Sequence, residues 1–510
     1  MRVLGGRRTS SFWGKAALAA GLIGAADVAL FGPAPGAAVG VAALLWTGAT
    51  AATGGRIGRG RGALFALAAV LAVALFDRPT VIGAACFWVA LTSAALLSRG
   101  AAAVDAWAWT RRLAAHAARS LQGPTQDFAR LKRLSGGQRV TLRGVVSTAV
   151  LPLGGGAVFL ALFASANPIV AGLLSRVRVP APNLVVLARA LFWSAALVAV
   201  WATLRPFRRR VARRRPSPPA WSSVTPSVYL APTPVILALA LFNALFAVEN
   251  GLDLAFLWSG AGLPSGMTLA GYAHRGAYPL VATALLAGAF SLIFLQERSE
   301  TARRPLVRGL VGLWLAQNVF LVASSILRTV DYVEVYSLTR FRIAALLWMG
   351  MVGIGLALTG WRLLRRKSAA WLVNTNAAVL AGVLLLCSAV DLGEVAAAWN
   401  VSHAAELGGR AAVLDACYLA ELGPSALGPL GAFGRRPVPP DDRARAEWVR
   451  YRTVMELRRK QQDWRSWTWR GARRLQAADG RRPDGPEWSC ADRVPFAASA
   501  KTALTAKAVQ

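Results

Sequence analysis

Histidine and cysteine are scarce in this chain, which has three histidines and four cysteines among 510 residues. The histidines are His116, His274 and His403. They stand too far apart to form the HExxH spacing of zinc hydrolases. The cysteines show no CxxC spacing. Cys86 and Cys387 lie in apolar stretches and are expected to be packing residues, whereas the spacing of Cys417 and Cys490 leaves their pairing open.

Recognisable cofactor motifs are also lacking. The chain has no GxxxxGK[ST] loop, no nucleophile elbow and no convincing dinucleotide fingerprint. Residues 134–139, LSGGQR, match the signature motif of ABC transporter ATPases. That motif needs a P-loop and a whole ATPase domain, and the segment around it is too short for one. We therefore treat the match as coincidence and expect no cofactor.

Acidic residues are few, with 24 Asp and Glu against 58 Lys and Arg. In a soluble protein this excess would indicate nucleic-acid binding. Here the basic clusters fall in alternate gaps between apolar stretches, with about thirty Lys and Arg on one side and about seven on the other. The positive-inside rule then places the N-terminus in the cytoplasm and anionic lipid, not nucleic acid, at the basic loops.

Long apolar stretches dominate the first 395 residues. A bilayer requires roughly 20 apolar residues per helical span, and the sequence predicts an all-α, polytopic transmembrane helical bundle of about 11 spans with a small α-helical C-terminal domain. The expected spans are 15–31, 36–53, 62–76, 80–97, 144–166, 184–204, 233–258, 278–296, 306–327, 342–364 and 371–390. The second and third are short, and Pro152 with Gly154–Gly156 suggests a broken helix in the fifth.

Four regions follow from this pattern. They are the N-terminal transmembrane helices 1–97, a basic amphipathic cytoplasmic linker 98–143, a core transmembrane domain 144–395, and a basic Trp/Arg-rich C-terminal helical tail 396–510. In the linker, an apolar face with Trp107 and Leu121 opposes a polar face with His116, which favours a helix on the inner leaflet or a solvated cytoplasmic helix. In the tail, 441–476 is expected to form one helix. An odd span count puts the tail outside, and an even count would bring it inside.

Polar residues within and beside the core spans are the candidate site. Glu249 and Asp253 are four residues apart and share one helix face, with Asn250 between them. Ionisable groups in a bilayer are costly and indicate function, so this pair could hold a cation or exchange protons. With the predicted topology an outer-face polar cluster forms from Glu249, Asn250, Asp253, His274, Arg275, Arg328, Asp331, Glu334, Arg340 and Arg342. The alternative is a set of ordinary interfacial ion pairs.

Two motifs carry a family resemblance. Residues 272–276, YAHRG, and 336–342, YSLTRFR, resemble the YARRGF-like and YGLTxxR-like patterns of an uncharacterised family of bacterial multi-pass membrane proteins, a domain of unknown function. The stretch from Asn400 to Leu430 is similar to its post-membrane segment. The chain departs from the family at Ala277, where the family often has an aromatic residue. The resemblance implies a membrane fold and brings no established activity.

These observations favour a non-enzymatic role in solute or ion movement or in envelope sensing. The alternatives are a membrane-embedded transferase acting on a lipid-linked substrate and a scaffold that recruits partners through its tail. Heavy use of Ala, Arg and Gly is typical of a high-G+C bacterial genome. We therefore expect a bacterial inner-membrane protein with a cytoplasmic N-terminus and an extracytoplasmic tail.

Overall fold

The computed structural model describes ten parts of the chain. They are residues 2–32, 34–53, 57–97, 105–134, 183–206, 232–259, 286, 304–409, 413–484 and 486–490. Every regular element in these residues is a helix, which confirms the all-α prediction. Nine of the predicted spans coincide with helices. The expected span 144–166 lies outside the described residues, and only residue 286 of the span 278–296 is described.

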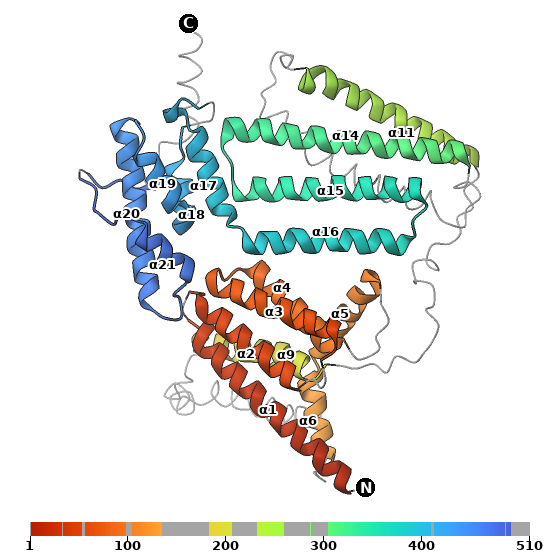
Figure 1. Cartoon of the computed structure of the whole chain (residues 1–510), viewed down its shortest axis with the longest axis vertical. Coiled ribbons are helices and arrows are strands. Elements are labelled where there is room, and N and C mark those ends of the chain that lie inside the picture. Colours follow the sequence, from red (N-terminus) through yellow and green to blue (C-terminus); the bar gives the residue numbers. More distant parts are fainter. Residues whose placement is uncertain are drawn as a thin grey trace, which may run out of the picture.

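An N-terminal unit is built from five apolar helices, with two shorter helices beside it (Figure 1). The five are α1 (Arg2–Leu30), α2 (Ala37–Thr53), α3 (Arg59–Asp77), α4 (Val81–Leu96) and α9 (Leu184–Leu204). Apolar side chains of α2, α3 and α4 form one buried cluster. One ion pair crosses this unit, because Arg189 donates two hydrogen bonds to Asp27, of 2.9 and 2.7 Å. Arg189 thus joins α9 to α1.

The core unit contains four helices, α11 (Pro232–Asp253), α14 (Pro305–Tyr336), α15 (Arg340–Arg365) and α16 (Ala369–Ala389). α11 continues for one π-helical turn, Leu254–Trp258. A buried cluster joins α11, α14 and α15 around Trp314. Asn243 of α11 contacts Leu310 of α14, and Asn250, seven residues later, contacts Gln317, also seven residues later. The residue numbers of the contacting pairs thus increase together along both helices. α11 and α14 therefore run in the same direction, as the predicted alternation of spans requires.

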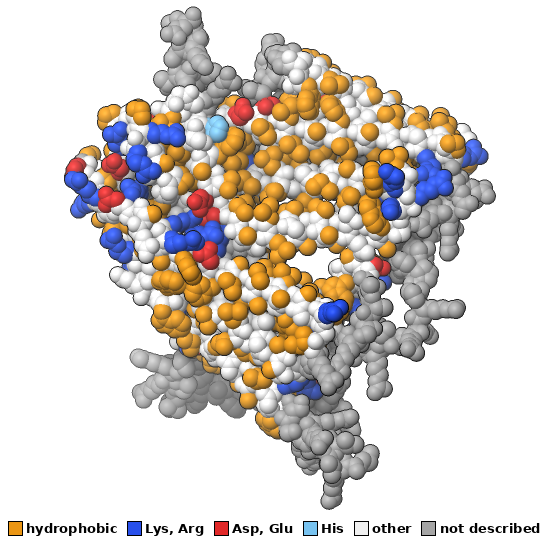
Figure 2. Space-filling model, viewed as in Figure 1, with side chains coloured by type: hydrophobic (Ala, Val, Ile, Leu, Met, Phe, Trp, Pro, Cys, Tyr) orange, Lys and Arg blue, Asp and Glu red, His pale blue; other side chains and the backbone are white. Residues whose placement is uncertain are grey.

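Seven of the described helices are long and apolar enough to cross a membrane: α1, α3, α9, α11 with its π turn, α14, α15 and α16. α2 and α4 are apolar but have only 17 and 16 residues, fewer than the roughly 20 that a straight crossing needs. The predicted count of about 11 spans is therefore not confirmed. Apolar side chains cover a broad outer face over α14, α15 and α16 (Figure 2). These features indicate a multi-pass membrane protein.

The C-terminal domain packs at one end of both helical units (Figure 1). Its helices are α17 (Leu392–His403), α18 (Ala416–Leu422), α19 (Leu427–Gly434), α20 (Pro440–Gln462) and α21 (Trp469–Gln476). The prediction of one helix over 441–476 is wrong, because Asp463–Thr468 forms a turn. Asp463 accepts hydrogen bonds from Arg465 and Thr468 caps α21, and both contacts compete with continued helix. Trp467 in this turn packs edge-on against Phe76 at the end of α3.

The linker also differs from its prediction. It forms two helices, α5 (Ala106–Ser120) and α6 (Gly123–Leu134). His116, expected on the polar face, is buried, whereas Trp107 and Leu121 are exposed. α5 packs against α9 and α16, and the Ala106 N–H donates to the Asn374 side chain at 2.7 Å. Protein contacts therefore cover one side of the linker and leave Trp107 and Leu121 exposed.

Candidate functional site

Three ionisable side chains meet between α11 and α14. Asp253, in the last turn of α11, is fully buried and forms an ion pair with Arg328 of α14, which is 5% exposed. Glu249, one turn earlier on α11, lies 3.7 Å from the same guanidinium and is 43% exposed. Because Glu249 and Asp253 share one helix face, both carboxylates lie beside the Arg328 guanidinium. We call these residues the Arg328 triad.

Side-chain amides continue this polar seam along the two helices. Asn250 Nδ2 donates to the Gln317 carbonyl at 3.2 Å, and Gln317 Nε2 donates to Asn243 Oδ1 at 3.3 Å. Asn243 Nδ2 donates in turn to the Leu310 carbonyl at 3.0 Å. Such contacts are the usual means by which polar residues join apolar helices. The seam therefore runs from the middle of α11 to the Arg328 triad.

The other residues of the predicted outer-face cluster do not all join the triad. His274 and Arg275 lie outside the described residues. Asp331 and Glu334 occupy the last two turns of α14, where Glu334 is exposed. Arg340 and Arg342 take part in a separate set of contacts at the start of α15. The predicted cluster is thus divided into at least two groups.

That second group is the turn between α14 and α15, which contains the motif 336–342. Arg342 Nη1 donates to the Tyr336 carbonyl at 2.6 Å, and the guanidinium lies 4.5 Å from the centre of the Tyr332 ring. These bonds hold the turn closed. Arg342, a member of the predicted outer-face polar cluster, therefore has a local structural role.

The C-terminal domain binds this same turn. Asn400 of α17 accepts from the Leu338 N–H at 2.6 Å and donates to its carbonyl at 2.9 Å. The Arg340 N–H donates to the Tyr418 hydroxyl at 2.8 Å. A Cβ on Gly393 would meet the end of the Arg340 side chain, which would then have to shift. The motif 336–342 and the stretch from Asn400 to Leu430, which both contribute to the family resemblance, are therefore in direct contact.

An ionic junction joins the N-terminal unit, the core unit and the C-terminal domain. Its centre is the Asp391 carboxylate, which follows α16 and is 6% exposed. Arg474 donates to it at 2.8 Å and Ser425 at 2.9 Å. Arg78 and Arg470 lie 3.7 and 3.8 Å away. We call this group, with Asp77 and Glu394, the Asp391 junction.

The outer members of the Asp391 junction extend its contacts between units. Arg470 of α21 forms an ion pair of 2.8 Å with Asp77 at the end of α3, and Arg474 forms one of 2.7 Å with Glu394. Burial alone would raise the pKa of Asp391. The Arg474 hydrogen bond, the Arg78 charge and the Ser425 hydroxyl outweigh burial and lower this pKa to about 2. Asp391 therefore stays ionised.

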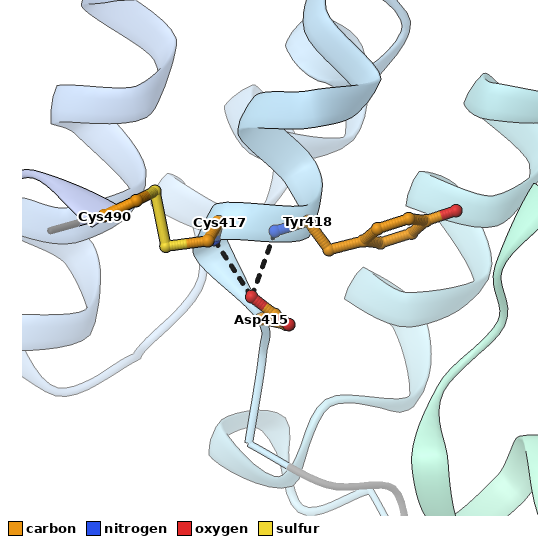
Figure 3. The surroundings of a disulfide bond; sticks show 4 residues. All are labelled: Asp415, Cys417, Tyr418 and Cys490. Carbon is orange, nitrogen blue, oxygen red and sulfur yellow. Dashed lines mark hydrogen bonds between the residues drawn. A yellow bond between two sulfur atoms is a disulfide. The ribbon is translucent and has the colours of Figure 1, made fainter. Parts of the chain in front are cut away.

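A disulfide closes the C-terminal domain. Cys417 at the start of α18 is bonded to Cys490, 73 residues later, with their Cα atoms 5.6 Å apart (Figure 3). The Asp415 carboxylate accepts from the Cys417 and Tyr418 N–H groups and so fixes the start of α18. The pairing that spacing left open is thus formed.

Replacing both of these cysteines by serine is expected to destabilise the C-terminal domain by about 2–4 kcal/mol, because the open loop regains freedom in the unfolded state. Thermal unfolding followed by circular dichroism would measure this loss. The double variant Cys86→Ser/Cys387→Ser is the control, since both of those thiols are free. Equal unfolding midpoints for the wild type and the Cys417/Cys490 variant would contradict the prediction.

Comparison with known proteins adds one result. No curated protein and no solved structure matches the chain. Residues 62–433 match a family described as "Domain of unknown function (DUF4153)". The match runs from α3 to α19, so it begins earlier than the core region in which the sequence motifs were recognised. It covers well over half of the chain, and the protein belongs to the DUF4153 family.

Proposed function

We propose that this protein moves or senses a proton or small cation across a bacterial inner membrane, with the Arg328 triad as its site. One observation carries the proposal: a buried guanidinium is shared by a fully buried carboxylate and by a carboxylate that reaches the surface. Buried charges in membrane helices are expensive and commonly mark ion or proton pathways. Protonation of Glu249, or its binding of a cation, would weaken its attraction to Arg328 and leave Asp253 as the partner.

Two features support an outward-facing site. The ends of the helices remote from the C-terminal domain carry basic residues such as Arg59, Arg205, Arg304 and Arg365, as expected of a cytoplasmic side. The C-terminal domain carries the disulfide, and disulfides persist in oxidising compartments outside the cytoplasm. The Arg328 triad lies toward the C-terminal end of α14, the end that contacts this domain.

A topology map tests this orientation. Alkaline phosphatase fused after Gly480 or Asp331 is expected to be active, and a fusion after Arg215 inactive, because this reporter folds only where its disulfides form. Fluorescent-protein fusions at the same positions should give the opposite pattern. Inactive phosphatase at Asp331 would place the Arg328 triad on the cytoplasmic side and exclude an outward-facing site.

The site itself is tested by Glu249→Gln in proteoliposomes. We expect this variant to lose most of the proton or cation flux driven by an imposed gradient, because it removes the exposed exchangeable carboxylate. Its stability should change by about 1 kcal/mol or less, since a half-exposed ion pair contributes little. Purified protein in liposomes with an internal pH or sodium dye provides the readout.

Glu334→Gln is the matched control, because Glu334 is an exposed carboxylate near the same end of α14. It should retain wild-type flux. The proposal fails if Glu249→Gln transports like the wild type, or if wild-type flux equals that of protein-free liposomes. The transferase alternative requires a metal-binding carboxylate cluster, and no group of three or more His, Cys, Asp or Glu in the described residues could hold a metal ion.

A further inference from the structure

The amides of the α11–α14 seam have fixed orientations. Every side-chain NH₂ group donates to a carbonyl oxygen: Asn243 to Leu239 and Leu310, Gln317 to Asn243, Asn250 to Gln317, and Asn318 to Trp314. Turning any of these amides over would bring two oxygens into contact. The hydrogen-bond network therefore determines where the side-chain oxygens lie.

Three of these oxygens receive no hydrogen bond. They are Asn250 Oδ1, Gln317 Oε1 and Asn318 Oδ1, and within the described residues they are buried without a donor. Asn250 is 8% exposed and Asn318 is fully buried. A buried acceptor without a donor is unfavourable. The seam is thus rich in acceptors and suited to a ligand that supplies positive charge.

The acceptors lie beside the Arg328 triad. Asn250 follows Glu249 in the chain and precedes Asp253 by three residues, which is an axial rise of about 4.5 Å in a helix. Gln317 is held across from Asn250 by the hydrogen bond between its carbonyl and Asn250 Nδ2. Asn318 is the next residue on α14. Asn250 thus lies between the two carboxylates along α11, and Gln317 faces it from α14.

We infer that Asn250 Oδ1 and Gln317 Oε1 form a binding site for a dehydrated monovalent cation. Oxygen ligands suit hard cations. Neutral amides offer too little charge for a divalent ion that must shed its water, so a monovalent ion is favoured. This inference rests on the proposed function, because the amide site would be the next position for a cation that exchanges at Glu249.

Thermal unfolding of the purified full chain in detergent tests the site without transport. The unfolding midpoint is compared in NaCl, KCl and choline chloride at equal ionic strength. A bound alkali cation raises the midpoint by several degrees at concentrations well above its dissociation constant, whereas choline is too large to enter. No rise over choline in either salt would overturn the inference and would indicate that water alone satisfies these oxygens.

Two substitutions make the assay specific. Asn250→Leu and Gln317→Leu should each abolish the cation-dependent rise, whatever they do to the midpoint in choline. Asn376→Leu is the matched control, because Asn376 Nδ2 donates to the carbonyl four residues earlier on α16, outside the seam. This control should keep the full rise. A rise that persists in Asn250→Leu and Gln317→Leu would place the cation elsewhere and overturn the inference.

The two proposals fail separately. Loss of flux in Glu249→Gln with no alkali-cation rise in the wild type would leave the proposed function intact for protons and remove the amide site. An unfolding midpoint that rises with alkali cations and depends on Asn250 and Gln317, without any flux, would support the cation site at these two amides and reject movement of the ion. Sensing would then be the remaining role of the Arg328 triad.

Discussion

Asp391→Ala is expected to reduce the free energy of unfolding by about 3–5 kcal/mol, because removing one partner of a buried ion pair leaves the other charge uncompensated. Here Arg474 and Arg78 would both lose the carboxylate that they share, and Arg474 is only 17% exposed. The loss should separate the C-terminal domain from the helices before the helices themselves unfold. Denaturant titration followed by circular dichroism would measure the loss, and limited proteolysis would show whether the C-terminal domain separates first.

Glu394→Ala provides the matched control for Asp391→Ala. Glu394 forms an ion pair with Arg474 at 2.7 Å, compared with 2.8 Å for Asp391, but its side chain is 52% exposed. An exposed pair of this kind contributes about 1 kcal/mol or less. Equal losses for the two variants would show that burial does not determine the strength of the Asp391 junction.

The same carboxylate predicts a pH dependence. Its pKa is lowered to about 2 in the folded protein, whereas an unfolded aspartate has a pKa near 3.9. A lowered pKa stabilises the folded state above the unfolded pKa, and this stabilisation is lost as the pH falls through the folded pKa. Asp391 should therefore contribute about 2.5 kcal/mol above about pH 5 and lose it progressively as the pH falls toward about 1. Asp391→Asn should lack this loss.

Most of the helices could be predicted because apolar runs are local in the sequence. The expected span 233–258 coincides with α11 and its π turn, and 371–390 with α16. α14 was expected to end at 327 but continues to Tyr336. Its last turns serve another purpose, since Val333 packs into the apolar core of the C-terminal domain. Hydrophobicity marks where a helix can cross a bilayer and does not show where it continues beyond.

The candidate site could be predicted only in part. The spacing of Glu249 and Asp253 placed them on one helix face, and the structure brings both to Arg328. Their contact with Arg328 depends on how α11 packs against α14, and tertiary packing produces no local pattern in the sequence. The Asp391 junction shows the same limit more strongly, because Asp391 binds Arg78, more than 300 residues away. Asp391 and Glu394 follow the last apolar stretch in the sequence, and nothing near them in the chain identifies their arginine partners.

Breaking the Arg328 triad should produce the other large effect. Asp253→Leu alone, or Arg328→Met alone, is expected to destabilise the protein by about 3–5 kcal/mol, because each removes one member of a buried ion pair and leaves the charge of the other in place. The double variant Asp253→Leu/Arg328→Met should recover most of that loss, since apolar side chains of similar size pack well between membrane helices. Unfolding in mixed detergent micelles would measure all three variants.

This cycle also separates a structural role from a functional one. If the Arg328 triad only joins α11 to α14, the double variant should regain both stability and flux. If the triad handles a cation, the double variant should regain stability while its flux stays near that of Glu249→Gln, because the charge that positions Glu249 is gone. A double variant whose loss of stability equals the sum of the two single losses would instead show that the pair does not interact, contrary to the buried contact between its side chains.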